Sequence, residues 1–390
     1  MGNKVLYKTN FYFNFFEKNI YPKIYTSIKS NVNTIPINSK TLNDFELEDF
    51  GTLIIELFPS YLTYQLDSRY AFDLLKIFRV KGYCITIGKE ESLEGYLKTY
   101  FKPNFRTSMR RRLKGLEKCF NVSYRMFYGN IERGEYDYLM NELHAMLIRR
   151  FAQRNDQNMA LSRWKDYYDN TFELINENKA SLYVIYDDVK PIQISLSYHC
   201  DKILFLSIPS YNIDYSKFGL GNISVLKILE WCIVNKYEVM DMGFGAFDYK
   251  VKWCNQTYDF EHHLFYTKSS ILSRMLVFYI SVKTKLINYL LSKKVNLYYH
   301  QLKTFFLGGK KSDLKKFSKE QVDANSLELN KCKIIYPMKD NSFAFLRRAL
   351  CDFLYTYQEN VSKVEVYEFE RNRTFFFKVE NQILKITYES

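Results

Sequence analysis

Apolar and polar positions alternate in the middle of the chain, where three consecutive runs each predict a β-strand. Leu182–Tyr186 is a continuous apolar run, and Ile203–Ile208 is apolar except for Ser207. Between them, Ile192–Tyr198 alternates isoleucine and leucine with glutamine and serine. A period of two is typical of a strand that packs one face against a core. Turn-forming residues at 187–190 and 199–202 separate the runs. The pattern therefore predicts a hairpin followed by a third strand beside it.

The hydrophobic period then lengthens to that of an α-helix. After a turn that contains Gly219 and Gly221, apolar side chains recur at the spacing of one buried helix face, at Val225, Leu226, Leu229, Cys232 and Ile233. Two further runs, Tyr237–Asp241 and Glu261–Thr267, predict strands. The expected order is three strands, a glycine turn, a helix and two strands.

The glycine turn suggests an anion-binding site. Gly219 and Gly221 carry no Cβ, so a ligand can approach the main chain closely. The first amides of the following helix lack helical partners, and the helix dipole is positive there, which favours a phosphate or pyrophosphate. Two glycines before a helix also occur in ordinary loops, so this turn alone does not define a site.

The flanking segments predict smaller elements. Residues 1–100 contain the expected strands Thr52–Phe58 and Tyr83–Gly88, with a helix, Tyr70–Arg79, between them. After a helical stretch at 271–305, the glycines and lysines around residue 308 predict a linker. The last segment predicts a helix followed by three strands, at Phe343–Tyr357, Lys363–Phe369, Thr374–Val379 and Ile383–Tyr388.

A second glycine motif follows the central helix and makes the pattern specific. It reads Asp241-x-Gly243-x-Gly245-x-x-x-Tyr249-Lys250. With the order of elements, it resembles acyltransferases of the GNAT superfamily, and in particular the branch associated with cellulose and exopolysaccharide biosynthesis, which is related to FemAB-like peptidoglycan transferases. The resemblance covers roughly residues 100 to 270.

The resemblance implies a mixed α+β fold whose central, mostly antiparallel sheet is splayed at the donor site. It also implies a tandem, in which residues 1–100 form a degenerate GNAT-like half and residues 101–270 the intact acyltransferase domain. An amphipathic helix and linker (271–330) and a small α+β appendage (331–390) complete the expected organisation.

The resemblance further implies an acyl donor, acetyl-coenzyme A or another acyl-coenzyme A, and no metal. The donor's pyrophosphate would lie on the backbone of the first glycine turn, at Lys217, Phe218, Gly219, Leu220, Gly221 and Asn222. One residue departs from the family pattern, because Ser216 stands where an arginine or glutamine is usual. Lys217 is a candidate for the compensating charge.

Acyl transfer to an amine needs a base, a donor that polarises the thioester carbonyl, and an acid for the leaving thiolate. Tyr249 is the candidate acid, Asp241 or His144 the candidate base, and Lys250 belongs to the same motif. Each also has a structural interpretation: Asp241 as a turn or cap residue, Lys250 as an ion-pair partner, Tyr249 as one of 34 tyrosines. His144 borders an apolar helix stripe and fits a core histidine equally well.

The acceptor side is less defined. Arg149 and Arg150 end the helix that carries His144 and are candidates for binding an acidic acceptor, although a solvated helix end explains them as well. Gly243 and Gly245 are expected to form part of the substrate wall. The resemblance implies a small amine as acceptor, such as an amino sugar or a surface-polysaccharide precursor.

Composition limits the remaining choices. Hydrophobic residues make up 47% of the 390 and aromatic residues 18%, which excludes a wholly disordered chain and predicts more than one domain. The seven cysteines form no C-x-x-C pair, so they predict reduced core residues of a cytoplasmic protein rather than a zinc site or disulfide framework.

The net charge of +13 indicates an anionic partner. The densest basic run, Arg106–Lys118, spreads its cations around one predicted helix, which argues against a groove-reading nucleic-acid interface. The apolar stretch Ile271–Leu291 contains Arg274, Lys283 and Lys285. A charge near the middle of a span costs roughly 2.5–3.5 kcal/mol, so we expect this helix to pack on the protein or to contact a membrane surface peripherally.

Three hypotheses about function follow. The first is an N-acyltransferase that uses acyl-coenzyme A. The second keeps the fold but takes aminoacyl-tRNA as donor, as FemAB-like transferases do; the positive charge favours it, and the intact glycine turn argues against it. The third is a non-catalytic basic protein that binds a membrane surface or nucleic acid. The sequence leaves the oligomeric state undetermined.

Overall fold

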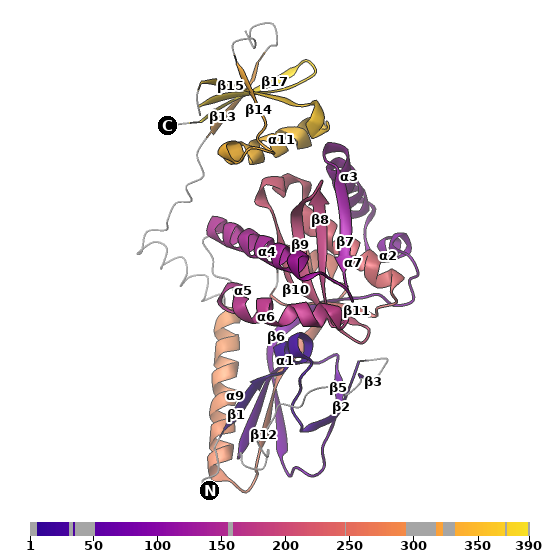
Figure 1. The fold of residues 1–390 in the computed structure, drawn as a ribbon. Helices are drawn as coiled ribbons and strands as arrows, with labels where there is room; N and C mark the ends of the chain where they lie inside the picture. Colours follow the sequence, from indigo (N-terminus) through magenta and orange to yellow (C-terminus); the bar gives the residue numbers. More distant parts are fainter. Residues whose placement is uncertain are drawn as a thin grey trace, which may run out of the picture.

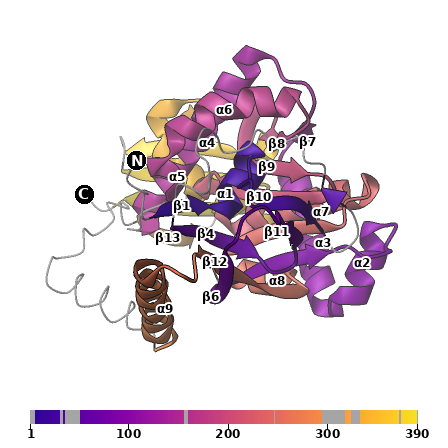
Figure 2. The ribbon, with the colours of Figure 1, turned by 90° about the horizontal axis from the view of Figure 1, so that it is seen from below.

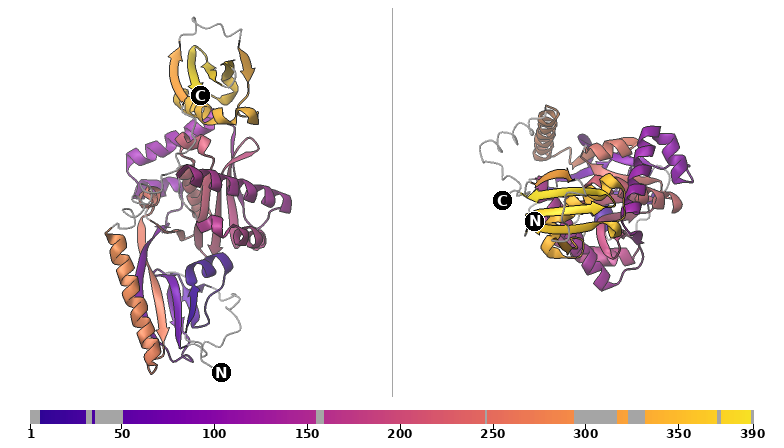
Figure 3. Two further views of the ribbon diagram at one scale, coloured as in Figure 1. Left: turned by 90° about the vertical axis from the view of Figure 1, so that its left-hand side faces the viewer. Right: turned by 90° about the horizontal axis from the view of Figure 1, so that it is seen from above.

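The computed structural model describes residues 6–30, 34–35, 51–154, 159–245, 247–293, 317–322, 332–370 and 373–388. Figure 1 shows an elongated molecule in which one long sheet runs through the lower and middle parts and a small C-terminal unit lies at the top. The side view in Figure 3 shows the same stacking, with helix α9 standing along one edge. The predicted linker around residue 308 lies outside the described residues.

Among the described residues, the largest sheet has nine strands, and it combines the first 100 residues with the central segment. Two neighbouring pairs, β1–β4 and β10–β11, are parallel, and the others are antiparallel. The predicted α+β class is therefore confirmed. In spatial order the strands are β1 (Tyr7–Asn10), β4 (Thr52–Pro59), β12 (Gln256–Tyr266), β6 (Asp73–Thr86), β11 (Val239–Phe244), β10 (Ile203–Tyr211), β9 (Lys190–Cys200), β8 (Ala180–Asp187) and β7 (Val122–Phe127).

The three predicted central strands are confirmed as β8, β9 and β10. Their connections are two-residue turns, since Asp187 pairs with Lys190 and Cys200 with Ile203. Asp188 and Asp201 open these turns with φ of 52° and 51°, the left-handed conformation that tight hairpins require. Alternation is typical of a half-buried strand, yet β9 is buried on both faces, because helix α7 (Leu220–Val234) covers its polar side.

The prediction of a helix at Tyr70–Arg79 is wrong, because strand β6 begins within this segment, at Asp73. β6 pairs along its length with β12 and at its end with β11, so it lies in the interior of the sheet. Gly82 permits this pairing, since a Cβ there would lie 2.3 Å from the Tyr258 ring. These partners come from residues 239–266, and long-range pairing of this kind overrides a local helical pattern.

The parallel pair β10–β11 separates after three residues. Ile203–Phe205 pairs with Val239–Asp241, and beyond this point β10 continues to Tyr211 beside β9, while β11 continues to Phe244 beside β6. The sheet is thus splayed at the carboxyl ends of two neighbouring strands. Such a break in an open sheet is a common place for a ligand site.

Helices cover both faces of the sheet. One core lies under α1, α4 and α6, and the other under α2, α3 and α7. Figure 2, seen from below, shows these layers on either side of the strands, with α9 apart at the edge. The bounds are α1 (Phe11–Lys18), α2 (Leu93–Tyr100), α3 (Pro103–Cys119), α4 (Arg133–Arg154), α5 (Met159–Ser162), α6 (Trp164–Asn176), η2 (Ile213–Phe218), α8 (Asp248–Trp253) and α9 (Ile271–Ser292).

The predicted C-terminal helix and strands are also present. In the part of the chain that the structure describes, a five-stranded antiparallel sheet packs on α11, and α11 packs on η2 and α3. A separate three-stranded sheet joins β3, β2 and β5 near the N-terminus. The bounds are η5 (Asn341–Leu346), α11 (Arg347–Tyr357), η6 (Val361–Lys363), β13 (Phe317–Val322), β14 (Lys333–Ile335), β15 (Glu365–Glu370), β16 (Thr374–Val379), β17 (Gln382–Tyr388), β2 (Tyr25–Lys29), β3 (Thr34–Ile35) and β5 (Thr63–Leu66).

A buried histidine at the end of β9 makes stability depend on pH. The His199 ring contacts the Tyr237 hydroxyl at 2.8 Å and the Ser181 hydroxyl at 2.7 Å. Burial lowers the pKa of His199 to about 3. The folded state therefore keeps this ring neutral, whereas the unfolded chain protonates it below a pKa of about 6.5.

We predict that His199 costs stability as the pH falls from its unfolded pKa toward its folded pKa. The unfolded state binds the extra proton in this window, so wild type should lose about 1.4 kcal/mol per pH unit through His199 alone. Urea unfolding at pH 7 and pH 5 of wild type and His199→Gln measures the difference. Parallel losses in the two proteins would contradict the assignment.

Candidate functional site

The first glycine turn joins η2 to α7. Gly219 has a φ of 72°, and a Cβ at this position would lie 2.1 Å from Nη1 of Arg112. Only glycine therefore allows both the left-handed turn and the close approach of the arginine. The amides of Asn222 and Ile223 donate to the Gly219 carbonyl at 2.9 and 3.2 Å. The amides ahead of them precede the helical ladder, at the positive end of the α7 dipole.

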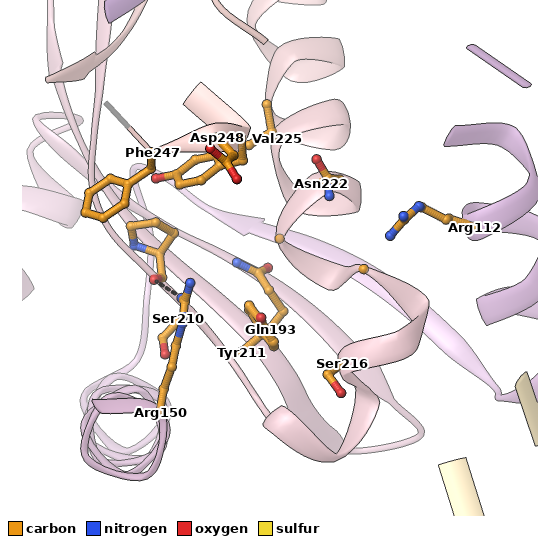
Figure 4. A pocket seen from close by; sticks show the side chains of 14 residues that line it. Arg112, Arg150, Gln193, Ser210, Tyr211, Ser216, Asn222, Val225, Phe247 and Asp248 are labelled. Carbon is orange, nitrogen blue, oxygen red and sulfur yellow. Dashed lines mark hydrogen bonds between the residues drawn. The ribbon is translucent and has the colours of Figure 1, made fainter. Parts of the chain in front are cut away.

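A cavity of about 510 Å³ opens beside this turn (Figure 4). It lies at the mouth of the splay, between the end of β10 and helix α8, which follows β11. Helices α3 and α4 each contribute one arginine to its wall. The lining residues are Arg112, Arg150, Gln193, Pro209, Ser210, Tyr211, Ser216, Gly219, Gly221, Asn222, Val225, Phe247, Asp248 and Tyr249.

The charge of the lining favours an anion. Arg112 approaches from α3 and Arg150 from α4, so two guanidinium groups and the α7 N-terminus face one cavity (Figure 4). Arg150 donates to the Pro209 carbonyl at 3.3 Å and lies 4.7 Å from the centre of the Tyr211 ring. These contacts fix its direction. Together the cations and the free helix end suit a phosphate or pyrophosphate.

Several buried polar atoms on the lining have no hydrogen-bond partner within the part of the chain that the structure describes. They are Oε1 of Gln193, Oγ of Ser210 and Nε of Arg112. Gln193 and Ser210 are each only 1% exposed. An unpaired buried polar atom costs about 1–3 kcal/mol, so a group of them on one wall indicates that a polar ligand or water pairs with them.

A hydrogen-bond chain fixes the direction of Gln193. Its Nε2 donates to the Ser195 hydroxyl at 2.6 Å, and that hydroxyl contacts the Ser224 hydroxyl of α7 at 3.0 Å. Because the amide nitrogen is held by β9 and α7, the amide oxygen is left for the cavity. This chain explains why serine and glutamine occupy the buried side of β9.

A side-chain hydrogen bond joins helix α8 to the first turn of α7. The Trp253 indole donates to Oδ1 of Asn222 at 3.0 Å and packs edge-on against Phe101 and Phe105. This contact holds the last residue of α8. At the start of the same short helix, Tyr249 lines the cavity and stacks on Phe247 at 6.3 Å between ring centroids. The second motif, read as a glycine turn in the sequence, therefore continues into a short helix.

The structure brings five of the predicted site residues together on the cavity wall: Gly219, Gly221, Asn222, Arg150 and Tyr249. Phe218 and Leu220 are fully buried and support the turn from below. Lys217 points elsewhere, because its ammonium lies 3.4 Å from the Asp352 carboxylate of α11. The guanidinium next to the turn is that of Arg112 instead.

Asp241 lies beneath the splay rather than on the cavity wall. Its buried carboxylate accepts hydrogen bonds from Tyr61 at 2.7 Å, Tyr258 at 2.8 Å and the Gly243 amide at 2.6 Å. Burial raises the pKa of the Asp241 carboxyl, and these donors oppose the rise. Gly243 has a φ of 68°, and a Cβ there would lie 3.1 Å from the Tyr12 hydroxyl.

Lys250 is buried and closes the second motif. Its ammonium donates to the carbonyls of Met242 and Phe244 at 2.5 and 2.8 Å, and burial lowers the pKa of Lys250 to about 8. Gly245, with a φ of 94°, turns the chain between β11 and α8. Asp241 and Lys250 thus hold the two ends of the segment that presents Tyr249.

His144 and Arg149 also lie outside the cavity lining. The His144 ring stacks on Trp164 with 4.6 Å between centroids, and partial burial lowers the pKa of its imidazole. Arg149 forms a bidentate pair with Asp214 at 2.6 and 2.8 Å and donates to Asn212 at 3.0 Å. Arg149 therefore ties α4 to η2 and supports the glycine turn from outside.

Several lining residues were not among those predicted for the site, including Arg112, Gln193, Ser210 and Asp248. Arg112 belongs to the basic run Arg106–Lys118, whose cations spread around the predicted helix. Nothing in the local sequence distinguishes Arg112 as the cation that contacts Gly219. Gln193 carried a weak signal as a polar residue inside a strand. Ser210 follows the predicted end of its strand and carried none.

Comparison with known proteins adds an independent observation. Residues 103–251 match the family model described as an acetyltransferase (GNAT) domain. No curated protein sequence matches the chain.

Solved structures with a similar fold share little sequence and align loosely. The C-terminal domain (DUF2156) of a putative lysylphosphatidylglycerol synthetase from Agrobacterium fabrum is 10% identical, with a TM-score of 0.38 over 57% of this chain and 70% of that one. FemX is 10% identical, with a TM-score of 0.38 over 55% and 72%. A tandem GNAT protein from the clavulanic acid biosynthesis pathway is 10% identical, with a TM-score of 0.27 over 57% and 66%.

The family match runs from the start of α3 into α8 and so includes the splayed strands, the first glycine turn and all the residues that line the cavity. That residues 1–100 derive from a degenerate second copy stays a prediction, although they supply β1, β4 and β6 to the same sheet. The central segment of the chain, residues 103–251, is thus similar to an acetyltransferase (GNAT) domain.

Proposed function

We propose that this protein is an N-acyltransferase that transfers an acyl group from acyl-coenzyme A, with acetyl-coenzyme A as the simplest donor, to an amine. One observation carries the proposal: a cationic cavity with unpaired buried polar atoms lies at the N-terminus of α7, where β10 and β11 separate. Its volume of about 510 Å³ lies within the range of small-molecule sites.

The residues of the cavity fit such a donor. The α7 N-terminus and Arg112 would hold its pyrophosphate, with Arg112 taking the place of the arginine or glutamine that Ser216 replaces. Gln193 Oε1 and Ser210 Oγ would pair with the amide groups of the pantetheine arm, which satisfies both buried atoms. Tyr211 and Val225 supply apolar contact.

The bound donor would supply a thioester, and the chain would manage the protons. In the transfer, the amine nitrogen forms a bond to the acyl carbon, the carbon–sulfur bond breaks, the thiolate takes one proton and the amine loses one. Tyr249 lines the cavity and is our candidate to protonate the thiolate. Asp241 and Lys250 act as positioning residues, because they hold the segment on either side of Tyr249.

The base follows from the same geometry. Asp241 is enclosed by the hydroxyls of Tyr61 and Tyr258, and His144 stacks on Trp164, so neither reaches the lining. Among the described lining residues, the carboxylate is that of Asp248. We assign the amine's proton to Asp248, whose charge also favours a cationic acceptor. The acceptor class, an amino sugar or surface-polysaccharide precursor, rests on the resemblance of the second motif alone.

One observation favours a second candidate function with the same chemistry. A groove between α2 and α3 is lined by Lys98, Arg106 and Arg110, and so presents cations on the helix that also carries Arg112. A nucleic-acid backbone would suit this groove, as a FemAB-like transfer from aminoacyl-tRNA requires. Glu94 neutralises part of it by pairing with Arg110 at 2.6 Å, so we rank this function second.

We predict that Arg112→Gln weakens binding of acetyl-coenzyme A by about tenfold or more, because a charge-assisted contact to phosphate is lost. Isothermal titration calorimetry with the full chain measures this. Pantetheine, which lacks the phosphates, should bind both proteins alike. Arg110→Gln, on the same helix but outside this cavity, is the matched control and should leave affinity unchanged. Equal affinities of wild type and Arg112→Gln for acetyl-coenzyme A would contradict the donor site.

We predict that Tyr249→Phe lowers kcat by about 10²-fold or more with little change in KM, because the variant keeps the ring and loses the proton donor. Release of free thiol from acetyl-coenzyme A, with glucosamine as the acceptor probe, provides the assay. Asp248→Asn should lower kcat at neutral pH, whereas Asp241→Asn should lower thermal stability more than it lowers kcat. The reverse ranking of the two aspartates would move the base role to Asp241.

A further inference from the structure

Helix α9 packs on the sheet through its small side chains and leaves most of its large apolar side chains exposed. The side chains that it buries against β4, β6 and β12 are small, and several are polar: Ser273, Val277, Ser281 and Thr284. Of its large apolar side chains, Ile280 packs partly buried against the sheet, and most of the others point away from it. Met275 is 65% exposed, Phe278 71% and Leu286 55%, values opposite to those expected of a core-packing helix.

The exposed side chains form one continuous face along the whole helix. With 3.6 residues per turn, they fall on the side opposite the buried serines. The outward apolar face consists of Ile271, Leu272, Met275, Phe278, Tyr279, Val282, Leu286, Tyr289 and Leu290. Figures 2 and 3 show α9 standing at the edge of the molecule. Scattered surface hydrophobics are ordinary, but a contiguous apolar patch of this kind marks a binding surface.

Specific hydrogen bonds hold the helix in this orientation. The Ser273 hydroxyl donates to the Gly51 carbonyl at 2.9 Å near one end. Near the other end, Asn288 donates to the Phe78 carbonyl at 2.8 Å and accepts from Arg79 at 3.0 Å. Rotation of α9 to bury its apolar face would break all three contacts. The outward face is therefore built into the fold.

Charge identifies the kind of partner. Helix α9 contains Arg274, Lys283 and Lys285 and no acidic residue. By the helical period, Arg274 and Lys285 lie along one border of the apolar face and Lys283 along the other. Two copies of α9 packed through these faces would bring cations together without a counter-charge. An anionic lipid surface offers an apolar layer for the face and negative headgroups for both borders.

We infer that α9 is an interfacial membrane-binding helix that places the protein on an anionic bilayer surface. Among the helices that the structure describes, none is long and apolar enough to cross a membrane. The helix would therefore lie in the plane of the interface, with the aromatic rings of Phe278, Tyr279 and Tyr289 at headgroup depth. This inference is independent of the acyltransferase proposal.

Vesicle cosedimentation of the full chain tests the inference. We expect binding to mixed phosphatidylcholine–phosphatidylglycerol vesicles, weaker binding in high salt, and little binding to phosphatidylcholine alone. Met275→Ser with Phe278→Ser should weaken binding by about tenfold or more, and so should Arg274→Ser with Lys285→Ser. The matched control, Val189→Ser with Phe369→Ser, removes exposed apolar side chains elsewhere and should bind like wild type. Equal binding by all four proteins would overturn the inference.

A fluorescent reporter separates lipid from protein partners. Phe278→Trp should emit like an exposed tryptophan in buffer and shift to the blue when the mixed vesicles are added, whereas Phe369→Trp should not shift. A reporter that is already blue-shifted in buffer and unchanged by vesicles would show that protein covers the face. Light scattering of the same sample would then distinguish a second copy from the chain itself, and either result would overturn the membrane assignment.

Discussion

The separation of β10 from β11 is the constraint on which the rest of the site depends. The two strands pair only through Ile203–Phe205 and Val239–Asp241, and each is then held by its other neighbour, β9 on one side and β6 on the other. Asp241 lies at the point of divergence, where Tyr61, Tyr258 and the Gly243 amide satisfy its carboxylate. The opening is thus maintained by the long sheet around it, and the cavity lies at its mouth.

Buried polar atoms on the cavity wall, unpaired within the described chain, destabilise the free protein. Gln193 Oε1 and Ser210 Oγ are buried without partners in the described structure, at about 1–3 kcal/mol each. The Gln193–Ser195–Ser224 chain directs one of these atoms toward the cavity. Apolar residues in place of Gln193 and Ser210 would leave no unpaired polar atom at these two positions and would remove this cost. The presence of these polar residues is consistent with a ligand that forms hydrogen bonds with both atoms when it binds.

The sequence predicts those parts of the fold and the site that depend on local patterns, and fails where contacts join residues far apart in the chain. Strands β8–β10, helix α7 and the turn at Gly219 follow from local periodicity and turn chemistry, and all were predictable. Only the end of β6 matches the predicted strand Tyr83–Gly88. Its first part was predicted as a helix, because the strand's partners lie at residues 239–266 and its local pattern resembles a helix. Arg112 approaches Gly219 only in the folded chain. For α9, periodicity revealed an apolar face but could not tell whether that face points inward, since the packing of Ser273 and Asn288 decides it.

The proposed function depends on binding of the acyl donor in the cavity beside α7. Hydrogen–deuterium exchange of the full chain with and without acetyl-coenzyme A tests it most directly, because backbone amides of the turn are the proposed phosphate ligands. We expect donor-dependent protection of residues 218–224 and of α8, with α9 and α11 unchanged. Protection elsewhere with no change at residues 218–224, or no protection at saturating donor, would contradict it.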